Sequence, residues 1–326
     1  MIQIQREDWA GLEEAWTALV RQAKQPAGPF TAPQFMSAWW DVFGADTELE
    51  LLSVRDGGDL IGVLPLMRRN GGICFIGNPE VSDYMDLLAQ RGREEDVVAA
   101  LLAHLDASGV SDAELRGLAA GSETLTHLPA LAQARNWTVH QEQEAVCPVL
   151  PLAANWDAYL AGLKKKYRHE VRRKLRNLLD GGAAVDLETA EDPDDVMERL
   201  PTFLRLMTDS RGDKAMFMTE QMATFFRCLV SRLAPAGFLR LYFLVLDGKC
   251  AAAVLCLLHD GTVMLYNSGY DPGYRDLAVG IASKVFVVRD CIERGLSTLN
   301  FLRGEEDYKF QLGAQPTPVT RLVLTR

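Results

Sequence analysis

Two stretches of the chain share one pattern of apolar and polar positions. Residues 52–88 and 243–277 each hold two apolar runs joined by a glycine turn, then a second turn and a third run, and then a segment rich in Tyr and Asp. Asp-Gly or Asn-Gly between apolar runs is a strong hairpin signal, because Gly tolerates positive φ. The stretches lie about 190 residues apart. A shared period of that length predicts a duplicated domain rather than a solenoid.

The same predicted elements surround both stretches in the same order. The first half reads as strand 2–5, helices 8–23 and 33–43, strands 49–55, 60–69 and 72–77, helix 93–107, strand 112–116, helix 123–135, and strands 137–140 and 146–150. The second half reads as strand 184–190, helices 193–210 and 219–234, strands 239–246, 250–259 and 262–268, helix 279–294, strand 297–302, short helix 305–312 and strand 319–325. This order predicts an α/β fold with a mixed sheet of the α+β type.

Two prolines, Pro148 and Pro151, place the expected domain boundary near residue 150. The expected domains are therefore 1–150 and 151–326. A basic helix over residues 155–180 leads the second domain and has no counterpart in the first.

Composition is that of an ordinary globular protein, with 326 residues, 48% hydrophobic and 24% charged, enough for two cores. The longest apolar run, residues 250–258, is too short to span a membrane, and the N-terminus has no signal pattern. The six cysteines form no CxxC pair, and the five histidines form no HxxH or HxxxH. We therefore expect a cytoplasmic protein with no transmembrane segment and no metal. The phosphate-loop, dinucleotide and GxSxG motifs are also missing.

Charge is unevenly distributed along the chain. The formal net charge is −10, yet residues 164–176 hold eight Lys or Arg against one Glu. Apolar residues recur at helical spacing on one side of this segment, and Arg168 and Arg172 belong to another side. This pattern predicts an anion site for CoA phosphates, a lipid- or nucleotide-linked acceptor, or tRNA. A solvated face paired with carboxylates is an equally good interpretation. The acidic remainder of the chain argues against nucleic acid as a partner.

Three segments carry a family resemblance. They are YRHEVRRKLRNLLDGG, the block from DGK through AVLCLLHDGTVMLYNSGYDPGYRDLAVG, and NFLRGEEDYKFQLGA, which together span about residues 155–315. PQFMSAWWDVFG and GNPEVSDYMDLL fit in the first half. The chain resembles the CelD-like acetyltransferases, a tandem form of the GNAT acyltransferase fold related to the Fem-type peptidyltransferases. The resemblance implies two GNAT-like domains, of which the first is degenerate.

In GNAT enzymes the turn before the main helix offers backbone N–H groups to the pyrophosphate of the donor, as helix N-termini do for anions. The resemblance implies such a donor site, for acetyl-CoA or another acyl-CoA, at Arg275, Leu277, Ala278, Val279 and Gly280. The alternative is that Gly280 serves only close packing. The equivalent first-half segment, SDYMDLLAQRGREED, is acidic and would repel a pyrophosphate. We therefore expect the donor in the second domain.

The resemblance also implies a catalytic residue in NFLRGEEDYKFQLG. A tyrosine on this short helix often protonates the leaving thiolate in GNAT enzymes, and Tyr308 fits that position. Arg303 and Lys309 are expected to bind substrate, with an exposed, salt-bridged helix as the alternative. Asn300 stands where the family usually has Asp.

Asp83–Tyr84 and Tyr270–Asp271 occupy related places in the two halves. Asp83 and Asp271 are candidate bases acting through a water, and Tyr84, Tyr270 and Tyr266 are candidate substrate contacts in a cleft between the domains. An Asx turn with a half-buried tyrosine explains each pair equally well.

The sequence thus predicts transfer of an acyl group from an acyl-CoA to an amine or hydroxyl of a small, sugar-linked or amino-acid-derived acceptor. One alternative is Fem-like transfer from an aminoacyl-tRNA. The other is a non-catalytic scaffold in polysaccharide or envelope assembly.

Overall fold

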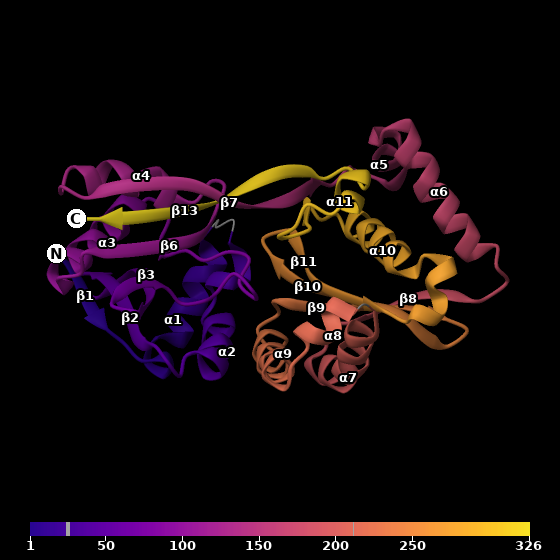
Figure 1. The fold of residues 1–326 in the computed structure, drawn as a ribbon, viewed down its shortest axis with the longest axis horizontal. Helices are drawn as coiled ribbons and strands as arrows, with labels where there is room; N and C mark the ends of the chain where they lie inside the picture. Colours follow the sequence, from indigo (N-terminus) through magenta and orange to yellow (C-terminus); the bar gives the residue numbers. More distant parts are fainter. Residues whose placement is uncertain (24–26, 211) are drawn as a thin grey trace. The chain divides into compact units, whose positions relative to one another are not determined.

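The computed structural model describes residues 1–23, 27–210 and 212–326 (Figure 1). Its contacts divide the chain into a first unit, Met1–Val146 with Pro318–Arg326, and a second unit, Cys147–Thr317. The boundary expected near residue 150 leaves the C-terminal strand in the second domain. In the structure, the end of that strand pairs with the first unit, because Leu322 and Leu324 are buried in the core of that unit.

The first unit is a mixed sheet with helices on it. Its strands follow the order β1-β2-β3-β4-β6-β13, and the pair β4–β6 is parallel. The elements are β1 (Ile2–Arg6), α1 (Trp9–Gln22), η1 (Gly28–Thr31), α2 (Pro33–Phe43), β2 (Glu48–Asp56), β3 (Asp59–Arg69), β4 (Gly72–Phe75), β5 (Leu88–Ala89), α3 (Glu94–Ser108), β6 (Asp112–Ala119), α4 (Glu123–Gln133), β7 (Thr138–Pro151) and β13 (Gln315–Thr325). β7 is one strand where two were predicted.

The second unit repeats this plan. The end of β7 pairs with β12, and the order continues β12-β11-β10-β9-β8, with β11–β12 as the parallel pair. The elements are α5 (Trp156–Gly162), α6 (Lys165–Leu179), β8 (Val185–Ala190), α7 (Pro193–Ser210), α8 (Gly212–Phe217), α9 (Glu220–Leu233), β9 (Leu239–Leu246), β10 (Lys249–His259), β11 (Thr262–Tyr270), η2 (Pro272–Leu277), α10 (Val279–Glu293), β12 (Thr298–Asn300) and α11 (Asp307–Gln311).

The hairpin turns adopt the left-handed backbone that their sequences predict. Both residues have positive φ in Asn70–Gly71, Asp247–Gly248 and Asp260–Gly261. Two consecutive residues of this kind form the turn that matches the twist of the flanking strands. In the first hairpin the turn is Gly57–Gly58, since Asp56 pairs with Asp59. It therefore lies one residue later than the predicted Asp56–Gly57.

The basic helix predicted over residues 155–180 is two helices. Leu163 takes extended backbone angles (φ −69°, ψ 144°) and is buried in the core of the second unit, which ends α5 before α6 begins. In α6, Val171 and Leu178 are buried and most of the cations are exposed, as the apolar stripe predicts.

The sheet of the second unit has helices on both faces. Figure 1 shows α10 on one side of the strands and α7 and α9 on the other. Val285 and Val288 of α10 are buried against β10, β11 and α5. No helix among the described residues is long and apolar enough to cross a membrane.

Candidate active site

A cavity of about 320 Å³ lies in the second unit where two parallel strands part. β11 pairs with β12 over Thr262–Met264, and β11 then runs on to Tyr270. η2 and α10, which follow β11, and the segment through α11, which follows β12, line the space between the two strands. The cavity is lined by Ser210, Lys214, Ser268, Tyr270, Arg275, Ala278, Val279, Gly280, Ile281, Lys284, Glu306 and Tyr308.

The N-terminus of α10 opens on this cavity. Ala278 precedes the helix in the left-handed conformation (φ 52°), and no side chain of the described residues caps the helix. The first N–H groups of a helix lack an intrahelical partner and carry the positive end of its dipole. Arg275 lies beside them on η2. The structure therefore brings together four of the five predicted donor residues at a place suited to an anion.

The fifth, Leu277, packs partly buried against the apolar cluster around Leu178 and Val279. Gly280 also has a packing role: a Cβ built there would lie 3.0 Å from Cδ1 of Tyr270. Both interpretations of Gly280 therefore hold at once, because it lines the cavity and lets the Tyr270 ring approach the helix.

Tyr308 lines the cavity from α11. Its ring stands edge-on to Phe301, with ring centroids 6.1 Å apart and an interplanar angle of 82°. This contact fixes the ring between the core and the cavity. The role of Tyr308 as a proton donor for a thiolate stays a prediction.

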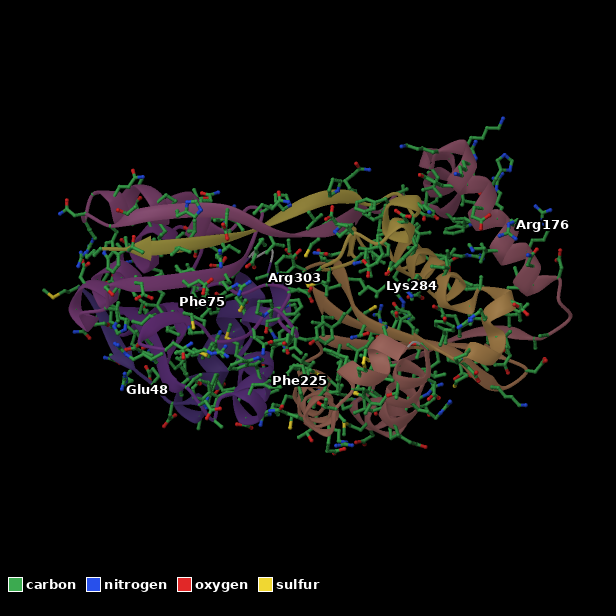
Figure 2. All side chains as sticks on the ribbon, in the orientation of Figure 1. Glu48, Phe75, Arg176, Phe225, Lys284 and Arg303 are labelled. Atoms are coloured by element: carbon green, nitrogen blue, oxygen red, sulfur yellow. The ribbon has the colours of Figure 1, made fainter. Side chains whose placement is uncertain are left out.

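Lys284 is a buried cation within the cavity lining. It lies one turn into α10, is 7% exposed, and donates from Nζ to the carbonyl oxygen of Gly280 at 2.7 Å. Figure 2 labels it on α10. Burial, reinforced by the nearby charge of Lys214, lowers the pKa of Lys284 from 10.5 to about 7. An unpaired ammonium loses its hydration when buried, so the neutral amine is favoured.

Lys214 and β11 meet at the cavity edge. Nζ of Lys214 donates to Oδ1 of Asn267 at 3.1 Å and to the carbonyl oxygen of Ser268. Asn267 Oδ1 also accepts from the N–H of Ser268 at 2.9 Å. The backbone N–H of Ser268 is therefore already used by the side chain of Asn267.

Lys309 is not placed to bind a substrate. It is 2% exposed and donates to the carbonyl oxygens of Leu302, Arg303 and Gly304 at 3.1, 2.7 and 3.1 Å. Its ammonium also lies 2.9 Å from Oε2 of Glu306. An ammonium has three N–H groups, so these partners use its donors. The substrate-binding role predicted for Lys309 gives way to a role in clamping the loop before α11.

The side chains of Asn300 and Asp271 also accept hydrogen bonds from backbone N–H groups nearby in the chain. Oδ1 of Asn300 accepts from the N–H of Leu302 at 2.9 Å, and Oδ1 of Asp271 accepts from the N–H of Gly273 at 2.8 Å. Asp271 thus forms the Asx turn that was the alternative to a base. Asp271 lies at the start of η2, whereas Tyr270 lines the cavity.

Four further predicted residues are not among those that line this cavity. The ring of Tyr266 packs on Phe226 of α9, with centroids 6.0 Å apart. Arg168 donates to the carbonyl oxygen of Ala161 at 3.2 Å, and Arg172 is exposed on α6. In Figure 2 Arg176, on the same helix, extends away from α10. Arg303 is half-buried in the loop before α11.

The corresponding place in the first unit is entered by its own chain, beside a cavity of about 240 Å³ lined by Gly77, Met85 and residues of β3, β4 and β6. The ladder between β4 and β6 covers Ile73–Cys74, and Met85 enters where the strands part. The N–H of Met85 donates to the carbonyl oxygen of Gly117 at 3.0 Å. A Cβ at Gly77 would lie 2.8 Å from Sδ of Met85, and one at Gly117 only 2.7 Å from its N. Only glycines leave room for this segment.

Asp86 anchors that segment. It is 1% exposed and accepts from the hydroxyls of Ser122, at 2.6 Å, and Thr124. Burial raises the pKa of Asp86 to about 6. The neighbouring candidates have less access to ligand: Tyr84 is 3% exposed with its ring edge-on to Phe30, and Asp83 is half-buried. Tyr84 is thus a core residue, contrary to the prediction of a substrate contact.

Several cavity residues escaped the sequence analysis because they come together only through the fold. Ser210, Lys214, Ile281 and Lys284 belong to three helices, α7, α8 and α10. One signal was available for Lys284: it interrupts the apolar start of α10, four residues after Gly280. Among the described residues, no group of three or more His, Cys, Asp or Glu is placed to hold a metal ion.

Residues 165–310 match the acetyltransferase (GNAT) domain family. No curated protein sequence matches the chain. The match includes α6, η2 and α10 and ends within α11, so it covers most of the elements that build the cavity. It confirms the predicted GNAT acetyltransferase domain.

Three solved structures have a similar fold over the whole chain. A conserved protein of unknown function from Bacteroides thetaiotaomicron VPI-5482 aligns at a TM-score of 0.65 and 13% identity, over 100% of both chains. FemX aligns at 0.66 and 13%, over 98% of this chain and 96% of its own. A tandem GNAT protein from the clavulanic acid biosynthesis pathway aligns at 0.51 and 15%, over 99% and 98%. These identities show the fold alone, which is the predicted α/β tandem fold.

Proposed function

We propose that this GNAT-type acyltransferase, whose residues 165–310 form the acetyltransferase domain, takes its acyl group from an acyl-CoA, with acetyl-CoA as the first candidate. The acceptor is an amine or hydroxyl of a small, sugar-linked or amino-acid-derived molecule. One observation carries the donor assignment: the uncapped N-terminus of α10 opens on a cavity whose lining includes Arg275 and Tyr308.

The size and charge of the cavity support a thioester donor. About 320 Å³ is at the small end of ligand pockets, which suits the acyl-thioester arm better than a whole nucleotide. Backbone N–H groups at Val279 and Gly280, with Arg275 beside them, suit the pyrophosphate at the mouth. Tyr308 is then available to protonate the leaving thiolate. Holding acceptor and thioester together supplies much of the rate enhancement.

Titration calorimetry with acetyl-CoA and longer acyl-CoAs tests this proposal. We expect binding by the wild type and a weakening of about tenfold or more in Arg275→Met, because charge-assisted hydrogen bonds contribute about 1.5–3 kcal/mol. The matched control is Arg227→Met, which removes an exposed arginine paired with Glu220 on α9. A folded wild type that binds none of these compounds rejects the proposal and favours the scaffold function.

Gly280→Asp is a poor test of the same site. An added side chain there meets the Tyr270 ring, so a loss of binding would report packing as well as charge. Arg275, which is exposed, can be changed without that ambiguity.

A second candidate function is transfer of an aminoacyl group from a charged tRNA. The observation that favours it is the exposed basic side of α6, which includes Lys165, Arg172 and Arg176. A gel-shift titration with tRNA at several salt concentrations tests this function. If the helix holds phosphates, changing these three residues to Gln reduces the salt slope by about 3. No salt-dependent shift by the wild type rejects it.

A further inference from the structure

We propose that Lys284 takes the proton from the acceptor during acyl transfer, acting as the general base of the cavity. This inference rests on the proposed acyltransferase function and deepens it. It assigns to Lys284 the base role that the sequence suggested for Asp271 and Asp83.

The geometry places the amine inside the reaction space. Lys284 lines the same cavity as Tyr308, and its Nζ lies 5.3 Å from the centroid of the Tyr308 ring. One N–H is held by the carbonyl oxygen of Gly280 at 2.7 Å. An amine held in this way still has a lone pair for an incoming proton. A general base must lie within hydrogen-bond reach of that proton, and a cavity-lining position meets this condition.

The charged groups around Lys284 come from four elements. Lys214 on α8 and Lys309 on α11 are cations, and both disfavour a further positive charge. Glu306, before α11, acts in the opposite direction, and Cys256 on β10 does so to a smaller extent. Burial is the largest effect, and the pKa of the amine falls to about 7. At neutral pH a large fraction of the protein therefore carries Lys284 as a free amine.

Glu306 is the neighbouring residue whose negative charge favours the protonated form of Lys284. Its carboxylate lies 2.9 Å from the ammonium of Lys309, which already balances its charge, and its side chain is 53% exposed. Water screens such a carboxylate, so it stabilises a charge on Lys284 only weakly. The cation of the pair is the buried Lys309, which repels a second ammonium.

The proposed step is balanced as follows. The acceptor nitrogen or oxygen attacks the thioester carbonyl carbon, so a C–N or C–O bond forms and the C–S bond breaks. The acceptor proton passes to Nζ of Lys284, and the departing thiolate takes a proton from the Tyr308 hydroxyl. The Lys284 ammonium then returns its proton to the Tyr308 oxygen. The products are the acylated acceptor and the free thiol, and both side chains end as they began.

A rival role for Lys284 is that of a permanent cation that binds an anionic substrate group. The two roles need opposite charge states, since a base must be neutral before the step and an anchor must be charged. Lys284→Arg keeps the charge and removes the basicity, because a guanidinium stays protonated throughout the working pH range. Lys284→Arg therefore retains the ability to bind an anionic substrate group and loses the ability to act as a base.

The first experiment measures the protonation of Lys284 directly. The protein is labelled with trace acetic anhydride at pH 5.5–10.5, and mass spectrometry follows each lysine. Burial slows any reagent, so the midpoint of the pH curve is the readout. We expect a midpoint near 7 for Lys284, well below the ordinary lysine value of 10.5. A midpoint at the ordinary lysine value would overturn the proposal.

The second experiment measures thiol release from acetyl-CoA with hydroxylamine as the probe acceptor, which is uncharged in the upper part of this pH range. The wild-type rate should rise with pH to a plateau, with a midpoint near 7. Lys284→Arg and Lys284→Met should lose that limb and fall by about 10²-fold at pH 8, as loss of a general base does. Lys249→Met, at an exposed lysine on β10, is the control and should match the wild type. A variant at position 284 that keeps the wild-type rate and profile refutes the base role.

The two failures can be told apart. Absence of acetyl-CoA binding in calorimetry would reject the proposed function, whereas the labelling midpoint reports on Lys284 alone. Thermal unfolding of each variant establishes that it is folded.

Discussion

Nζ of Lys284 lies 5.3 Å from the centroid of the Tyr308 ring, and both side chains line one cavity of the second unit. An aromatic face attracts an ammonium, by about 0.5–2 kcal/mol. Here that attraction opposes the larger effect of burial, which lowers the pKa of Lys284 to about 7. The pair therefore joins a side chain that is ready to accept a proton to one that can give a proton away.

Burial of Lys284 predicts that its removal stabilises the protein. Between about pH 7 and 10.5 the unfolded chain holds the proton that the folded protein has released, so this residue makes stability rise with pH. Below pH 7 the buried ammonium of Lys284 destabilises the folded protein most. Lys284→Met should be more stable than the wild type at pH 7 by about 2 kcal/mol. Urea unfolding at pH 7 measures the difference.

The same titration provides the internal control. The advantage of Lys284→Met should shrink as the pH is raised from 7 to above 10.5, because both states of the wild type carry the neutral amine only above that pH. An advantage that stays constant with pH would mean that the lysine is charged in the folded protein.

Asp86 predicts the opposite dependence in the first unit. Its pKa is raised from 3.8 to about 6, so between these values the folded protein holds a proton that the unfolded chain has lost. Stability from this group therefore rises as the pH falls from 6 to 4. Asp86→Asn should remove that gain, about 2 kcal/mol, in unfolding measured at pH 4 and 6.5. A variant with the wild-type slope would place the titration at another residue.

Gly269 predicts a steric limit beside the cavity. A Cβ there would lie 2.2 Å from the backbone nitrogen of Met207, where α7 crosses β11. Overpacking of this kind costs about 1–3 kcal/mol, so Gly269→Ala should lower the unfolding temperature. Gly162→Ala is the matched control, since a Cβ at that position meets none of the described atoms within 4 Å. Equal effects of the two substitutions would contradict the crossing.

The hydrogen bonds of Lys309 predict that the conformation of the loop before α11 depends on the ammonium of this residue. Lys309→Met leaves the carbonyls of Leu302, Arg303 and Gly304 without this donor and should destabilise the protein by about 2–3 kcal/mol. Amide exchange should quicken over residues 302–308. The control, Lys249→Met, removes an exposed lysine from β10. A loop that exchanges at the wild-type rate would rule out the clamp.

The sequence predicted the hairpins well because their signals are local. Asp247–Gly248 and Asp260–Gly261 need only their own backbone preferences to specify a turn. The candidate donor residues Arg275 and Gly280 were predicted through a family resemblance that also follows the local order of residues. Both belong to the short stretch around the start of α10.

The remaining features depend on contacts distant in sequence. The sequence near Lys284 gives one local signal, its place in the apolar start of α10. The cavity around it also needs Lys214, Glu306 and Tyr308, which are distant in sequence or on other elements. Leu163 interrupts the basic helix because it enters the core of the second unit. Lys309 looks like a substrate contact in sequence and becomes a clamp only when the loop folds back to it.

Hydrogen exchange with and without saturating acetyl-CoA tests most directly that the donor binds the second unit, where the N-terminus of α10 opens on the cavity, and not the first, where Met85 enters the equivalent gap. The full chain is used, so both units report in one sample. We predict slower exchange over residues 268–284 and 304–310, with residues 77–97 unchanged. Protection over residues 77–97 with none over 268–284 would contradict the account.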